Sequence, residues 1–97
     1  MRKITRRIKE AFHNQESLTI DNTTTNGKAV WLFGNKIIER REDGLYATLA
    51  GWDTPTTKER LNGILDGVSV STVRGDTYMT TREASGIINP SEWYKVR

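Results

Sequence analysis

The chain lacks the residues on which several kinds of chemistry depend. None of its 97 residues is cysteine, which excludes disulfide bonds, thiolate catalysis and cysteine-bound metal sites. His13 is the single histidine, and its polar surroundings at a helix end do not suit an acid–base pair. No cluster of carboxylates and no phosphate-binding glycine loop is present either. We therefore expect a protein that is not an enzyme, with no cofactor and no metal ion.

Long hydrophobic runs are also absent, so the chain has no segment near the roughly 20 apolar residues of a membrane helix, and we expect no membrane partner. Hydrophobic residues make up 35% of the sequence. A chain of this length buries about 65% of its unfolded surface, enough for one thin core. We expect residues 1–97 to form a single globular domain with a shallow binding face.

Positive charge is concentrated at one end of the chain. The net charge is +3, but the first ten residues hold five basic side chains and one acidic side chain, so the remainder is close to neutral. The basic residues are Arg2, Lys3, Arg6, Arg7 and Lys9. Such an end is attracted to phosphate backbones or to acidic protein surfaces, and salt screens this attraction. The alternative is a solubilising helix face without a partner.

The spacing of apolar residues predicts two amphipathic helices. In residues 2–13 the apolar positions fall on one side of a helix, namely Ile4, Ile8, Ala11 and Phe12. Asn14 would end this helix in the left-handed conformation. In residues 54–66 the apolar stripe is Leu61, Ile64 and Leu65, and Thr56 with Glu59 forms a capping-box pattern.

Three residues of the second helix are left outside its apolar stripe. They are Lys58, Arg60 and Asn62. We expect them to point away from the core and to be free for contact with a partner.

Between and after the helices, β-branched and aromatic residues alternate with turn dipeptides. The strongest turn signals are Asn26-Gly27, Gly34-Asn35 and Asp43-Gly44. They predict strands over residues 18–24, 29–33, 36–40 and 45–49, the second of them covered on both faces. Residues 68–80 predict a C-terminal hairpin that turns at Gly75-Asp76, and Trp93-Tyr94 could add a short strand.

The resulting order is α-β-β-β-β-α-β-β, an α+β fold. We expect an antiparallel sheet, made of a four-strand meander and a C-terminal hairpin, covered by two amphipathic helices.

Large aromatic side chains have two expected roles. We assign Trp31, Phe33 and Trp52 to the core, because a small domain needs large rings for packing. Trp93 and Tyr94 lie close to basic residues in the sequence. A ring beside a cation suits stacking on unpaired bases, and the same composition occurs at hot spots of protein interfaces.

Two strings of residues resemble a group of small conserved bacteriophage proteins. They are Leu-Phe-Gly-Asn-Lys-Ile at 32–37 and Ala-Gly-Trp-Asp-Thr-Pro-Thr-Thr-Lys-Glu-Arg-Leu-Asn at 50–62. The resemblance covers residues 12–65. It implies a phage accessory product in the cytoplasm of the infected bacterium, in a class of proteins that includes inhibitors of host nucleases and of CRISPR complexes.

Three functional hypotheses follow. The first is an anti-defence protein, similar to an anti-CRISPR, that binds a host protein or nucleoprotein complex. The alternative is a single-stranded nucleic-acid-binding protein, in which helix cations contact phosphates and C-terminal rings stack on bases. The third is a homo-oligomer that buries the basic helix. The residues expected to contact a partner or nucleic acid are Arg2, Lys3, Arg6, Arg7, Lys9, Lys58, Arg60, Trp93 and Tyr94.

Overall fold

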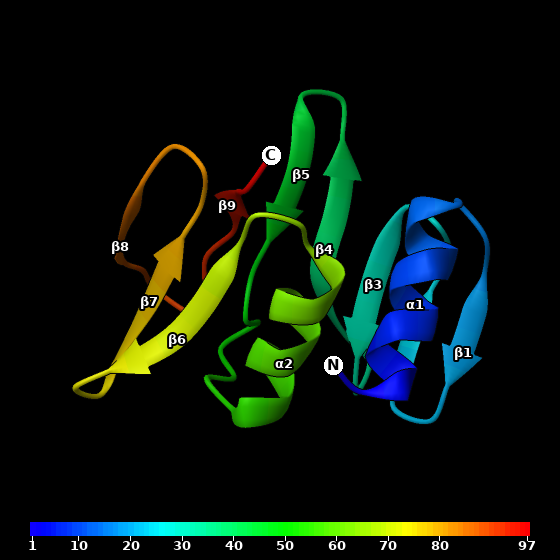
Figure 1. Cartoon of the computed structure of the whole chain (residues 1–97), viewed down its shortest axis with the longest axis horizontal. Helices are drawn as coiled ribbons and strands as arrows, with labels where there is room; N and C mark the ends of the chain where they lie inside the picture. Colours follow the sequence, from blue (N-terminus) through cyan, green and yellow to red (C-terminus); the bar gives the residue numbers. More distant parts are fainter.

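The computed structural model describes residues 1–97 and contains two helices and nine strands (Figure 1). In chain order the elements are α1 (Lys3–His13), β1 (Leu18–Ile20), β2 (Thr23–Thr25), β3 (Ala29–Leu32), β4 (Asn35–Arg41), β5 (Gly44–Ala47), α2 (Pro55–Ile64), β6 (Ser69–Val73), β7 (Asp76–Thr80), β8 (Ser85–Ile87) and β9 (Tyr94–Lys95).

The larger sheet has six antiparallel strands in the order β1-β2-β3-β4-β5-β9. Its first five strands form a meander, and β9 returns from the end of the chain to pair with β5. The two helices pack against each other and lie over one face of this sheet (Figure 1). The predicted α+β class, the helix-covered antiparallel sheet and the short strand near Tyr94 are confirmed.

The C-terminal strands form a sheet of their own, in the order β6-β7-β8. It follows α2 and stands to the left of it in Figure 1. The Asn62 side chain binds both backbone groups of Val70 in β6, with Nδ2 donating to the carbonyl at 2.9 Å and Oδ1 accepting from the amide at 2.6 Å. Asn62 is exposed, as expected, and its side chain attaches the second sheet to α2.

One hydrophobic core joins the helices and both sheets. The core includes Ile8 and Phe12 of α1, Leu61 of α2, Ile38 of β4 and Met79 of β7, all buried. Because apolar surface from both sheets is removed from water in the same cluster, the smaller sheet is stabilised by the rest of the chain.

The ends of the helices differ from prediction by one or two residues. Asn14 has an ordinary backbone conformation, and Gln15 takes the left-handed one (φ 57°). The cap of α2 is Thr54, whose Oγ1 accepts from the Thr57 amide at 3.2 Å. Proline suits the first helical position, so Pro55 begins the helix and the cap falls on the residue before it.

Two turns start one residue earlier than predicted. The β3–β4 turn is Phe33-Gly34 (φ 50° and 79°), and the β6–β7 turn is Arg74-Gly75 (φ 51° and 85°). Both have positive φ at two successive residues, as short hairpin turns require, with glycine in second place. A further turn at Asp21 (φ 53°) divides the predicted first strand into β1 and β2.

The expectation that the strand at 29–33 is covered on both faces is wrong. Val30 and Leu32 are buried, but Trp31 is only half-buried on the other face, where the Lys36 ammonium lies 5.6 Å from its ring centroid. The helices cover one face of the larger sheet, and the other face is partly open to solvent.

Arg60 is the largest fully buried side chain and is 1% exposed. Its Nε donates to Thr23 Oγ1 at 3.0 Å, and its Nη1 donates to Thr5 Oγ1 at 3.2 Å. Its Nη2 donates to Asn22 Oδ1 at 3.2 Å, and the guanidinium also pairs with Glu59. The expected exposure of Arg60 is wrong, because this side chain connects α2 to α1, to β2 and to the β1–β2 turn.

Helical spacing explains why Arg60 is buried. Thr57 and Ile64, three residues before it and four after it, are also buried, so Arg60 lies on the stripe that faces the core. Its charge suggested the opposite face, since arginine is rarely buried without partners. The three polar partners and Glu59 satisfy the guanidinium, so its burial is tolerated.

We expect Arg60→Met to lower the free energy of unfolding by about 3 kcal/mol, because it removes the cation that pairs with Glu59 and one donor each from Thr5, Thr23 and Asn22. Denaturant unfolding measures this loss. Arg74→Met, at an exposed turn, is the matched control and should change the free energy by less than about 0.5 kcal/mol. A loss below about 1 kcal/mol for Arg60→Met would contradict the structural role.

Candidate binding surface

Several elements meet at the lower end of the molecule in Figure 1, where both helices begin. We call this region the helix-start end; it consists of the first two turns of α1, the β1–β2 and β3–β4 turns, and the first turn of α2. The Phe33 amide donates to the Asn22 carbonyl at 2.8 Å, and the Arg2 amide lies 3.4 Å from Glu59 Oε2. These bonds hold the turns and both helix starts in one arrangement.

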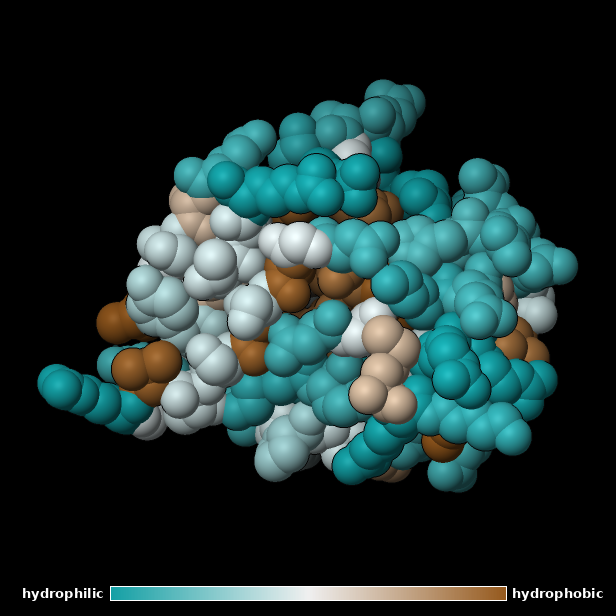
Figure 2. All heavy atoms as spheres, viewed as in Figure 1, coloured by the Kyte–Doolittle hydropathy of each residue, from teal (hydrophilic) through white to brown (hydrophobic).

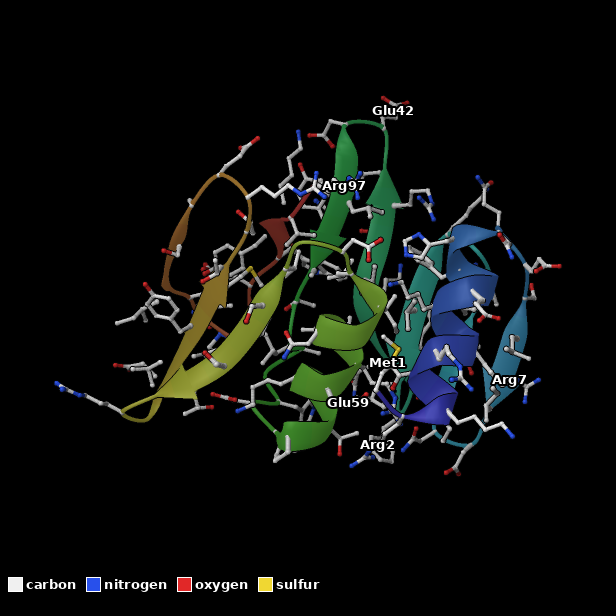
Figure 3. All side chains as sticks on the ribbon, viewed as in Figure 1. Met1, Arg2, Arg7, Glu42, Glu59 and Arg97 are labelled. Atoms are coloured by element: carbon white, nitrogen blue, oxygen red, sulfur yellow. The ribbon has the colours of Figure 1, made fainter.

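Four cations at the start of α1, one of them on the residue that precedes the helix, are exposed and have no ion-pair partner. They are Arg2, Lys3, Arg6 and Arg7. Arg7 lies on the outer side of α1 and Arg2 beside the start of the chain (Figure 3). The surface over α1, on the right of Figure 2, is mostly hydrophilic. Lys9 differs from these four, because its ammonium lies 2.9 Å from Asp66 Oδ1.

These cations do not stabilise α1 itself. Its first turn has no acidic residue, and no side chain caps its N-terminus. Positive charge beside the positive end of a helix dipole costs a few tenths of a kcal/mol per group. Helix stability therefore does not explain why these basic residues are clustered here.

Lys58 and Arg60 are occupied within the fold. The Lys58 ammonium lies 2.7 Å from Asp53 Oδ1, and Asp53 also accepts from Thr77 Oγ1 at 2.5 Å. This chain of contacts joins α2 to β7. Lys58 and Arg60 are both ion-paired, unlike the cations at the start of α1.

Trp93 and Tyr94 lie at the opposite edge of the larger sheet from α1, which packs on β1 and β2. Both side chains are half-buried. The Arg41 guanidinium lies 5.4 Å from the Trp93 ring centroid, and Tyr94 Oη accepts from the Asn89 amide at 2.8 Å. The structure does not bring these rings together with the α1 cations.

The large exposed rings are instead Phe33, 69% exposed, and Trp52, 59% exposed. Their assignment to the core is wrong. Phe33 is a turn residue, and Trp52 follows the sharp bend at Ala50 and Gly51 (φ 53° and 83°). The glycine next to each ring was the available signal, because it marks a turn whose side chains point outward.

Phe33 and Trp52 flank an apolar pocket of about 360 Å³ at the end of the core. Ile37 and Leu49 lie in its lining, and Thr54 and Thr57 at the start of α2 add two hydroxyls that bond each other at 2.9 Å. All of its lining residues except Leu49 come from the strings at 32–37 and 50–62. The two strings that carry the phage resemblance therefore meet at this pocket.

Two non-glycine residues of the pocket have left-handed backbones, Phe33 and Ala50. This conformation costs about 1–2 kcal/mol for a residue with a Cβ. Such strain tends to occur at binding sites, where the surrounding structure maintains it.

The single histidine bonds the backbone at the end of α2. His13 Nε2 forms a hydrogen bond with the Ile64 carbonyl at 3.0 Å. No group of three or more histidine and carboxylate side chains is placed to hold a metal ion. Neither helix has the length and hydrophobicity that a membrane span requires.

Contacts within the fold lower the pKa of three carboxylates on or beside α2. Burial raises the pKa of Glu59, but hydrogen bonds from Thr5, Arg60 and the Arg2 amide outweigh it, and the net pKa is lowered. The pKa of Asp53 is lowered by Lys58 and then by Thr77, while that of Asp66 is lowered by Lys9.

Residues 1–96 match the family model described as Kyanoviridae Gp96 protein. No curated protein and no solved structure matches the chain significantly.

The lowered pKa of Glu59 predicts a loss of stability in acid. The stabilisation is complete above the unfolded value of 4.5 and disappears as pH falls through the lower folded value. We expect Glu59→Gln to show a smaller drop in the free energy of unfolding than the wild type between neutral pH and about pH 3. Glu42→Gln, at an exposed turn, is the control. Equal drops for Glu59→Gln and the wild type would rule out this assignment.

Phe33→Asn tests whether Phe33 is present for stability. Asparagine tolerates the left-handed backbone, so we expect the free energy of unfolding to stay the same or to rise by up to about 1 kcal/mol. Denaturant unfolding measures the change. A decrease of more than about 1 kcal/mol would show that the ring packs as a core residue.

Proposed function

Because the chain belongs to the Kyanoviridae Gp96 family of phage proteins, we propose that it is a non-enzymatic accessory protein that acts against host defence. It binds a host protein or nucleoprotein complex in the cytoplasm of the infected bacterium, in the manner of anti-CRISPR inhibitors. The observation that carries this proposal is the set of four exposed, unpaired cations at the start of α1, namely Arg2, Lys3, Arg6 and Arg7.

An acidic partner supplies the negative charge that the first turn of α1 lacks. It neutralises the cations, and its negative charge interacts favourably with the helix dipole that they oppose. Charge complementarity of this kind speeds encounter with the partner and excludes positively charged surfaces. The remaining exposed charges, among them Lys28 and Arg74, are distributed over other parts of the fold.

Geometry favours a protein partner over single-stranded nucleic acid bound as the sequence suggested. The α1 cations and the rings of Trp93 and Tyr94 lie at opposite edges of the six-stranded sheet, so a bound strand would have to cross the sheet to contact both sets. Nucleic-acid binding would appear as affinity for oligonucleotides that falls steeply with added salt.

Charge reversal on α1 tests the proposal in cells. We expect expression of the wild-type protein in a host with an active defence system to raise the plating of a sensitive phage. Arg6→Glu with Arg7→Glu should reduce this effect at least about tenfold, since repulsion replaces attraction at the interface. The control pair Lys28→Glu with Arg74→Glu makes the same change in net charge elsewhere and should keep the effect.

Two results would contradict the proposal. One is full anti-defence activity of the α1 variant. The other is binding of the purified protein to oligonucleotides that is lost with the α1 cations, with no capture of a host protein. Folding of each variant is checked by its unfolding transition.

A further inference from the structure

We infer that the pocket between Phe33 and Trp52 is a docking site for one bulky apolar side chain, presented on an acidic segment of the partner protein. This inference rests on the proposed function and names the second half of the same interface. The α1 cations would contact the acidic residues of the segment, and the pocket would take its anchor.

The size and lining of the pocket suit such an anchor. A cavity of about 150 Å³ lined by apolar side chains binds benzene. The pocket holds about 360 Å³ and opens to solvent between two aromatic rings, with Ile37 and Leu49 in its lining. An aromatic or branched aliphatic side chain fits this volume and is removed from water on entry. Buried anchors surrounded by aromatic residues are typical of interface hot spots.

The two turns direct both rings out of the core, so the rings contribute little to its packing. Phe33 and Trp52 leave most of their surface in water although the core lies directly beside them. The backbone at Phe33 and at Ala50 is left-handed. The same left-handed pair forms the Arg74-Gly75 turn outside the pocket, but only at the pocket do two such turns place large rings on either side of one opening.

Charge at the helix-start end points to an acidic occupant. The positive ends of both helix dipoles lie there (Figure 1), beside the unpaired cations of α1. Arg60 donates to Thr5 of α1 and to the Asn22 side chain, and the Asn22 carbonyl accepts from the Phe33 amide. The first turns of α1 and the β3–β4 turn of the pocket are therefore joined through the same contacts. Glu59 and Asp53 are paired internally, which leaves Asp21 as the exposed carboxylate in the adjoining β1–β2 turn.

Asn35 provides a way to close the pocket without changing the core. It is an exposed lining residue at the start of β4, and its side chain makes no hydrogen bond within the chain. Asn35→Trp would place a large ring across the opening. Val73→Trp, at an exposed position of β6 outside the pocket, is the matched control.

The test uses synthetic acetylated pentapeptides and amide chemical shifts of the full chain. The probes are Asp-Glu-Phe-Glu-Asp, the same peptide with a central alanine, and Lys-Lys-Phe-Lys-Lys. We expect the first to shift amides of the β3–β4 turn and of the loop around Trp52. The alanine peptide should bind at least about fivefold more weakly, the basic peptide should not bind, and Asn35→Trp should abolish the shifts at the turn and loop while Val73→Trp keeps them.

Several outcomes would overturn the inference. They are equal binding of the phenylalanine and alanine peptides, shifts confined to α1, binding of the basic peptide, tighter binding of a single-stranded oligonucleotide at the same amides, or no binding of any probe at low salt. The cellular assay separates this inference from the proposed function. If Asn35→Trp keeps anti-defence activity while the α1 charge reversal loses it, the pocket is not part of the interface and the proposed function stands.

Discussion

The buried guanidinium of Arg60 is the contact on which the helix-start end depends. It donates to hydroxyls of α1 and β2, to the Asn22 side chain and to Glu59. In the low dielectric of the interior these bonds are strong, and a missing partner costs more than an average hydrogen bond contributes. The fold therefore cannot move α1, the β1–β2 turn or α2 separately at this end without leaving a buried charge unsatisfied.

This constraint places the two halves of the binding surface in a fixed relation. The inner face of α1 is held by Thr5 and by the apolar residues that follow it, so its basic residues face solvent. Asn22, which accepts from Arg60, also accepts the Phe33 amide through its backbone carbonyl. The β3–β4 turn and its pocket are thereby linked to the same network as the cationic helix. A rigid arrangement of charge and apolar pocket lowers the entropic cost of binding.

The sequence predicted the regular parts of this structure and missed the buried arginine and the apolar pocket. The α1 stripe and the order of elements follow from apolar spacing, which secondary structure obeys directly. Arg60 lies on the face of α2 that packs against the core. Its burial depends on Thr23 and Thr5, about 37 and 55 residues away, and local spacing does not reveal such partners. Phe33 and Trp52 were assigned to the core from size alone. The backbone conformation at two turns instead directs their side chains into solvent. The exposure of Arg2, Lys3, Arg6 and Arg7 follows from helical spacing alone, whereas the ion pair of Lys9 with Asp66 depends on a distant residue.

Native-state hydrogen exchange tests the central claim, that Arg60 joins the two helices into one unit at the helix-start end. If the network couples them, amides in the middle of α1 and α2 exchange through the same opening and report the same free energy. The account predicts this agreement in the wild type and its loss in Thr5→Val, which removes one acceptor of Arg60. Exchange of α1 at a free energy about 2 kcal/mol or more below that of α2 in the wild type would contradict the account.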